Sequence, residues 1–215
     1  MTGLPPTTPG VRFPGFDVLA ESEHWDPVTA GVVLARLGRA PDIRFFTPAE
    51  EAAAGALVDQ LLCQHSDSQP DEQKIPVLQL IDSRLAEHQT DGWHYADMPQ
   101  DSQAWRDTVS YLDEDAQGRH GTTFATCTGE QQAEIIQAVE DLGSDDWHGM
   151  SASRVWSLWT RYACSAFYSH PSAWNEIGFS GPAYPRGYKN IGVDTLEKGE
   201  VRDARPSDDP LRRES

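Results

Sequence analysis

The sequence lacks the short motifs that hold nucleotides, metals or nucleophiles in most enzymes. It contains no G-x-G-x-x-G, no Walker loop, no H-E-x-x-H and no G-x-S-x-G. We therefore expect no cofactor in this chain and no metal site. Asp91 lies near His94, and Asp145 and Asp146 lie near His148, but neither group has the paired spacing of a helical metal site. We interpret both as solvated acidic loops.

Cysteine is scarce as well. The three cysteines, Cys63, Cys127 and Cys164, form no C-x-x-C pair, which excludes a disulfide-dense framework. We expect buried free thiols, with one Cys63–Cys164 bridge as an alternative. A nucleophilic pair of Cys164 and His170 is conceivable, but catalytic partners usually converge from distant segments, so a packed thiol is favoured.

Positive charge and long apolar runs are also in short supply. The 17 Lys and Arg face 34 Asp and Glu, which gives a net charge of −17. This charge argues against binding to nucleic acid or to an anionic membrane surface. No run of about 18 apolar residues is present, and residues 1–16 lack the basic and apolar regions of a secretion signal. We expect a cytoplasmic protein that does not insert into a membrane.

What the sequence does contain is helical patterning. Thr47-Pro48-Ala49-Glu50 and Thr128-Gly129-Glu130-Gln131 have the form of capping boxes, each followed by apolar residues at helical spacing. Asp101 is expected to cap another helix, and Ser151 a long one that is apolar almost all round and therefore central. The predicted fold class is all-α, an irregular bundle of about six helices with extended N- and C-terminal arms. Further helices are expected at 26–38 and 76–85.

Glycine, proline and charge divide the chain into four predicted parts. An extended N-terminal arm covers residues 1–17, and the helical domain covers residues 18–177. A Gly/Pro/aromatic arm at 178–192 is expected to bind a partner, because its glycines and prolines prevent a continuous helix. Residues 193–215 are charged and nearly devoid of apolar side chains, so a mobile tail is predicted.

Aromatic side chains on irregular segments are the candidate binding residues. Large rings are favoured both in cores and at protein interfaces. Trp174 suits an interface and packing within its own domain equally well. His170 is expected at a helix end against the last carbonyls, with Pro171 opening a new turn. The predicted partner-binding residues are Phe13, Phe16, Trp174, Asn175, Glu176, Phe179, Tyr184, Arg186 and Tyr188.

Several of these residues belong to a stretch that resembles a known family. YSHPSAWNEIGFSGPAYPRGY, residues 168–188, is similar to the C-terminal signature of the gluconate 2-dehydrogenase subunit 3 family. Phe45 to Glu51 (FFTPAEE), Ile75-Pro76 and Asp91-Gly92-Trp93 resemble earlier landmarks of that family. The resemblance covers roughly residues 12–190 of the sequence.

This resemblance implies a function. It implies a non-catalytic small, or gamma, subunit that binds, stabilises or matures a large flavoprotein subunit of the glucose–methanol–choline (GMC) type. FAD is then expected in the partner, which oxidises a sugar or glycoside in a dehydrogenase or oxidase complex. Many members carry a twin-arginine signal. In this sequence no Arg-Arg pair precedes an apolar run, so export with the partner is less expected. The alternatives are a metal- or thiol-dependent enzyme and an acidic helical binding module without a redox partner.

Overall fold

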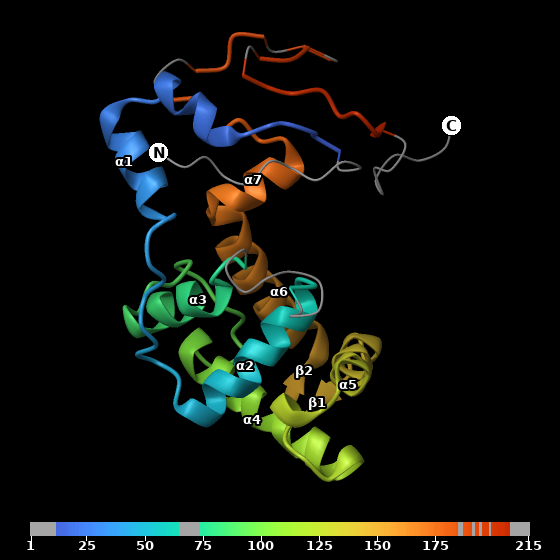
Figure 1. Cartoon of the computed structure of the whole chain (residues 1–215). Coiled ribbons are helices and arrows are strands. Elements are labelled where there is room, and N and C mark those ends of the chain that lie inside the picture. The colour runs from blue at the N-terminus through green and yellow to red at the C-terminus, as the bar shows by residue number, and fades with distance from the viewer. Residues whose placement is uncertain are drawn as a thin grey trace. The chain divides into compact units, whose positions relative to one another are not determined.

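Helices dominate the computed structural model of this chain, which describes residues 12–64, 74–184, 187–190, 192–193, 195–197 and 199–206. The all-α prediction is confirmed (Figure 1). Within the described residues, strands are limited to a small antiparallel hairpin, β1 (Asp146–Trp147) and β2 (Met150–Ser151). No helix among the described residues is both long and apolar enough to span a membrane.

The chain divides into two compact units. Residues 40–167 form one, which we call the central unit; the segments up to residue 39 and from residue 168 form the other, the terminal unit. The central unit contains α2 (Pro48–Leu61), α3 (Val77–Ala86), α4 (Asp101–His120), η3 (Phe124–Thr126), α5 (Gly129–Asp141) and nearly all of α6 (Ala152–Ser169). The terminal unit contains η1 (Val18–His24), α1 (Pro27–Ala35) and α7 (Pro171–Ile177). The four functional ranges expected from the sequence stay a prediction.

Two capping boxes start helices of the central unit as expected. At α2 (Pro48–Leu61), the Thr47 N–H donates to the Glu50 carboxylate at 2.8 Å, and the Glu50 N–H donates to the Thr47 hydroxyl. At α5 (Gly129–Asp141), Thr128 and Gln131 make the same reciprocal pair. Each box satisfies two N–H groups that a helix start leaves without partners. The starts of both helices are therefore determined locally.

Three features of the central unit differ from the sequence prediction or were not foreseen by it. Asp101 is the first residue of α4 (Asp101–His120), not its N-cap. Its carboxylate is buried and accepts a hydrogen bond from the Tyr162 hydroxyl at 2.8 Å. Ahead of α4, on α3 (Val77–Ala86), the fully buried Asp82 carboxylate accepts the N–H groups of Arg44, Phe45 and Phe46 at 2.7–2.9 Å. One buried carboxylate therefore holds residues 44–46 against α3, and another links the start of α4 to Tyr162.

Helix α6 (Ala152–Ser169) corrects another expectation. It is not buried all round: Ala152, Val155, Leu158, Trp159, Tyr162 and Ala163 are its buried residues, while Cys164 is exposed. The buried face packs on α4, where the Trp159 indole donates to the Thr108 hydroxyl at 3.0 Å. Ser151, the expected cap, lies in β2. The apolar count overestimated burial because Trp156 and Phe167 are only partly covered.

The cysteines are free. Cys127 is buried, and burial raises the pKa of its thiol. Cys63 and Cys164 are exposed, so the prediction of buried thiols is confirmed for Cys127 only, and the alternative Cys63–Cys164 bridge is not formed.

Candidate functional site

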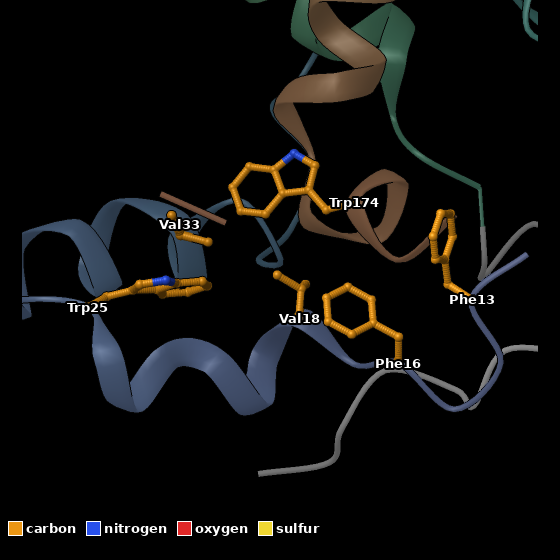
Figure 2. Packing of buried hydrophobic residues seen from close by; sticks show 6 residues of the cluster. All are labelled: Phe13, Phe16, Val18, Trp25, Val33 and Trp174. Carbon is orange, nitrogen blue, oxygen red and sulfur yellow. The ribbon is translucent and has the colours of Figure 1, made fainter. Parts of the chain in front are cut away.

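The two ends of the chain share one hydrophobic core in the terminal unit. Figure 2 shows aromatic and aliphatic side chains from the N-terminal segment and from α7 (Pro171–Ile177) pointing toward one another. They come from the segment before η1 (Val18–His24), from η1 itself, from the residue that follows it, from α1 (Pro27–Ala35) and from α7. The cluster consists of Phe13, Phe16, Val18, Trp25, Val33 and Trp174.

Hydrogen bonds reinforce this join between distant parts of the sequence. The buried Asn175 side-chain oxygen accepts the Val18 N–H at 2.8 Å across a sequence separation of 157 residues. The Trp174 indole donates to the Tyr168 carbonyl at 2.7 Å. The Val18–Asn175 bond connects the first and last parts of the range predicted as the helical domain, 18–177.

Two glycines allow the chain after α7 to approach this core. Gly178 has φ of +67°, and a Cβ there would lie 2.6 Å from the Phe13 ring. Gly181 has φ of +81°, and its Cβ would overlap the Trp25 ring. Glycine alone adopts such φ values without strain, and only a residue without a side chain leaves room for the rings. Both positions are thus needed for conformation and for packing.

His170 caps α7 and does not lie against the last carbonyls of α6 as expected. Its Nδ1 accepts the Ser172 N–H at 3.3 Å, and Pro171 takes the first helical position. Nearby, the Arg36 guanidinium donates to the Ser169 carbonyl at 2.7 Å. Burial lowers the pKa of His170, with the positive charge of Arg36 acting in the same direction and a hydrogen bond to the Arg36 backbone opposing them. The neutral imidazole is the form that can cap the helix.

The charged segment near the C-terminus is better anchored than its composition predicts. The Glu197 carboxylate is buried and accepts the N–H groups of Lys189 and Asn190 at 2.5 and 2.6 Å. The Arg12 guanidinium pairs with Asp203 at 2.5 Å. Val201 packs against the core cluster. As far as it is described, this segment is held by a few specific contacts to residues that precede it.

The predicted partner-binding residues fall into two groups. Phe13, Phe16, Trp174 and Asn175 are buried within the terminal unit. The others that the structure describes are exposed: Glu176 on α7, and Phe179, Tyr184 and Tyr188 after it. Burial raises the pKa of the Glu176 carboxyl even though part of the side chain is at the surface. Arg186 lies outside the described residues. The role of all of them in partner binding stays a prediction.

The three exposed rings of this set are among several exposed large apolar side chains in the terminal unit. Phe179 packs edge-on against Trp174, with the ring centroids 5.3 Å apart, while Tyr184 and Tyr188 are 66% and 58% exposed. Sequence reasoning missed most of the remaining members, because a helix such as α1 with apolar residues on several sides gives no sign of which face is covered. The exposed large hydrophobic residues described in the terminal unit are Val28, Val32, Tyr168, Ile177, Phe179, Tyr184, Tyr188, Val193 and Leu196.

Charge is distributed differently from apolar exposure. Residues 40–167 contain 22 acidic and 7 basic residues, a net charge of −15. The rest of the chain contains 12 acidic and 10 basic residues, a net charge of −2. The terminal unit therefore combines nearly balanced charge with the greater part of the exposed aromatic surface.

Asp91 and His148, considered above as metal ligands, have other partners in the structure. Among the described residues, no three His, Cys, Asp or Glu side chains are grouped as metal ligands. Asp91 pairs with Arg84 and Arg161. His148 stacks on Tyr111, with ring centroids 4.5 Å apart, and lies 2.9 Å from the Asp115 carboxylate.

Comparison with known proteins identifies the family. The model of the gluconate 2-dehydrogenase subunit 3 family matches residues 48–181, which is more than half of the chain. No curated protein and no solved structure gave a match. The matched range begins at Pro48, the first residue of α2, and includes the loop at Asp91-Gly92-Trp93 and the C-terminal stretch as far as Gly181. The chain therefore belongs to the gluconate 2-dehydrogenase subunit 3 family.

Proposed function

We propose that this protein is a non-catalytic subunit that binds and stabilises the FAD-containing large subunit of a carbohydrate dehydrogenase complex. The family to which it belongs is defined by a subunit of gluconate 2-dehydrogenase, so assembly into a dehydrogenase complex follows from membership. We assign the large subunit to the GMC type, as the sequence resemblance implies, and place the flavin and the hydride chemistry in that partner.

The observation that carries this proposal is the concentration of exposed rings in the terminal unit. Protein interfaces are enriched in aromatic residues and depleted of charge at their centre. Phe179, Tyr184 and Tyr188 are exposed on a unit whose net charge is only −2. A concentration of exposed large apolar side chains in one unit favours an interaction site there.

The buried residues of the candidate set hold the exposed rings and the chain around them in position. Trp174 supports the Phe179 ring, and Asn175 ties α7 to the N-terminal segment through Val18. Gly178 and Gly181 direct the following chain across Phe13 and Trp25. A surface that is ordered before binding loses less conformational entropy when the partner arrives, which raises affinity without new contacts.

Co-expression with a flavoprotein encoded beside this chain tests the proposal. We expect a single complex in size-exclusion chromatography that absorbs in the visible range of a bound flavin, and a large subunit that is insoluble or flavin-free when expressed alone. Separate elution of this chain beside an independently soluble, active flavoprotein contradicts the proposal. Activity in the isolated chain favours the alternative of a self-sufficient enzyme.

A pair of substitutions makes the test specific to the proposed surface. Tyr184→Ala with Tyr188→Ala removes two exposed rings that make no described core contact, so the fold is retained while the dissociation constant rises roughly 10- to 100-fold. The matched control, Tyr184→Phe with Tyr188→Phe, keeps the rings and is expected to bind within about threefold of the unmodified chain. Equal binding by the alanine and phenylalanine pairs removes these rings from the interface.

A further inference from the structure

One loop of the central unit differs from the rest of its surface. The segment between α3 and α4 holds Trp93 and Tyr95, which are 50% and 38% exposed. They are the only exposed large hydrophobic side chains among the described residues of 40–167. Their rings meet edge to face with centroids 5.4 Å apart. Aromatic residues are enriched at protein interfaces, so among the described residues of this acidic unit the pair is the best candidate for an interface.

The loop is anchored by an ion-pair network. The Asp91 carboxylate accepts hydrogen bonds from Arg84 and Arg161, one on each oxygen. Arg161 also donates to the buried Asp101 carboxylate at 3.1 Å. Both guanidinium groups lie over the Tyr162 ring, at 4.8 and 5.0 Å from its centroid. A loop connected in this way to α3, α4 and α6 has a defined position on the unit.

Each of the two exposed rings also makes a cation–π contact with an arginine. The Arg161 guanidinium lies 5.1 Å from the Trp93 ring centroid, and the Arg154 guanidinium lies 4.8 Å from that of Tyr95. Arg154 in turn pairs with Asp97 within the same loop. Cation–π contacts fix ring orientation, and rings that are already ordered lose little side-chain entropy on binding. Trp, Tyr and Arg are also the residues enriched at the energetic centres of interfaces.

The dimensions of the site favour a protein over a small molecule. The depression beside Trp93 has a volume of about 160 Å³ and is lined by Thr90, Gly92, Trp93, His94, Gln100 and Asp101. Small-molecule sites usually enclose about 300 to 1,000 Å³. A depression of this size fits one side chain of a protein whose surface also covers the neighbouring rings.

Charge indicates the chemistry of that protein surface. Arg84, Arg154 and Arg161 are all paired with carboxylates, so the aromatic pair itself is close to neutral. The unit around it carries a net charge of −15. A complementary surface therefore has an apolar side chain at its centre and Lys or Arg around it.

We propose that Trp93 and Tyr95 form a second docking surface for the large flavoprotein subunit, separate from the rings of the terminal unit. This inference rests on the proposed function. Each unit of the chain then contacts the partner through its own aromatic residues, and two linked contacts bind more tightly than either alone.

The test co-expresses the full-length chain with the flavoprotein encoded beside it, purifies the complex, and measures its dissociation on serial dilution by size-exclusion chromatography, because the flavoprotein is expected to be insoluble or flavin-free alone. Trp93→Ala with Tyr95→Ala is expected to raise the dissociation constant roughly 10- to 100-fold. Asp91→Ala keeps both aromatic side chains but removes the ion pairs that hold the loop. It is expected to raise the dissociation constant by a smaller factor. Ser110→Ala, an exposed change on α4, is the matched control and is expected to bind like the unmodified chain.

Three outcomes separate this inference from the proposed function. If the unmodified chain forms the complex and the Trp93/Tyr95 variant binds equally well with an unchanged thermal melt, the second docking surface is wrong and the proposed function stands. If the unmodified chain does not bind, both are wrong. If the variant complex dissociates more readily while the variant chain keeps an unchanged thermal melt, and the complex of the unmodified chain dissociates more readily as salt is raised, as expected for a basic rim facing an acidic unit, the inference is supported.

Discussion

The central and terminal units differ in helix length, in the make-up of their cores and in how many large hydrophobic side chains they expose. The central unit has longer helices, a core of residues from α2 to α6 and a net charge of −15. The terminal unit has short helices, a core of six clustered side chains and a chain path that depends on glycines with positive φ. It also exposes most of the large hydrophobic side chains. Under the proposed function, the irregular unit supplies the surface for the partner.

This difference predicts that the two units have different weak points. In the central unit, the most costly single change should remove a buried polar anchor. In the terminal unit, it should disturb the close approach of two chain ends. Three changes test this difference, and hydrogen exchange shows in which unit each one acts.

Asp82→Ala should have the largest effect. It leaves the N–H groups of Arg44, Phe45 and Phe46 without their acceptor, in a place where Asp82 is fully buried. We expect the free energy of unfolding of the central unit to fall by about 3 kcal/mol, measured by urea denaturation. Asp145→Ala, an exposed carboxylate, should change it by less than about 0.5 kcal/mol. A similar loss for both variants contradicts the role given to Asp82.

Gly178→Ala should destabilise the terminal unit by about 2 to 3 kcal/mol. The added methyl group has a strained φ and also overlaps the Phe13 ring. Gly187→Ala is a matched control, since Gly187 has φ of +66° with no neighbouring atom within 4 Å. That variant should lose only the conformational part, about 1 kcal/mol. Protection of the Val18 amide from hydrogen exchange reports the loss, and equal effects of the two variants rule out the packing contribution.

Lowering the pH should produce the smallest effect, confined to the terminal unit. The pKa of His170 is lower in the folded than in the unfolded chain, so folding favours the neutral imidazole. The stabilisation is therefore complete above the unfolded pKa of about 6.5 and is lost as the pH falls through the folded value. We expect the protection of the α7 amides, taken relative to the exchange of an unfolded chain at the same pH, to fall between about pH 6.5 and the folded pKa.

His170→Asn separates this titration from other acid effects. Asparagine caps helix starts well but does not titrate, so the variant should keep α7 and lose the pH dependence in that window. His24 pairs with Glu21 in the same unit and remains in both proteins, so the difference between them isolates His170. An identical pH response of the two proteins contradicts the proposed cap.

Local signals in the sequence predicted much of the central unit. The boxes at Thr47 and Thr128 specified the starts of α2 and α5, because their hydrogen bonds span only three residues. Long-range contacts were not predictable in this way. Asp82 and Asp101 look like ordinary helix residues, and their role depends on the N–H groups of Arg44 to Phe46 and on the Tyr162 hydroxyl. The Trp93/Tyr95 site became visible only once the arginines beneath it were in place.

The sequence by itself determined the helical class, the capped helix starts, the strong negative charge and the family. These properties depend on composition, on contacts between near neighbours or on a recognisable stretch of residues. The tertiary structure decided which aromatic residues are buried and which are exposed. Phe13 and Trp174 meet in one core although the chain separates them by most of its length, while Tyr184 and Tyr188 remain at the surface. Residue type alone does not fix burial, because burial depends on which distant segments fold against each other.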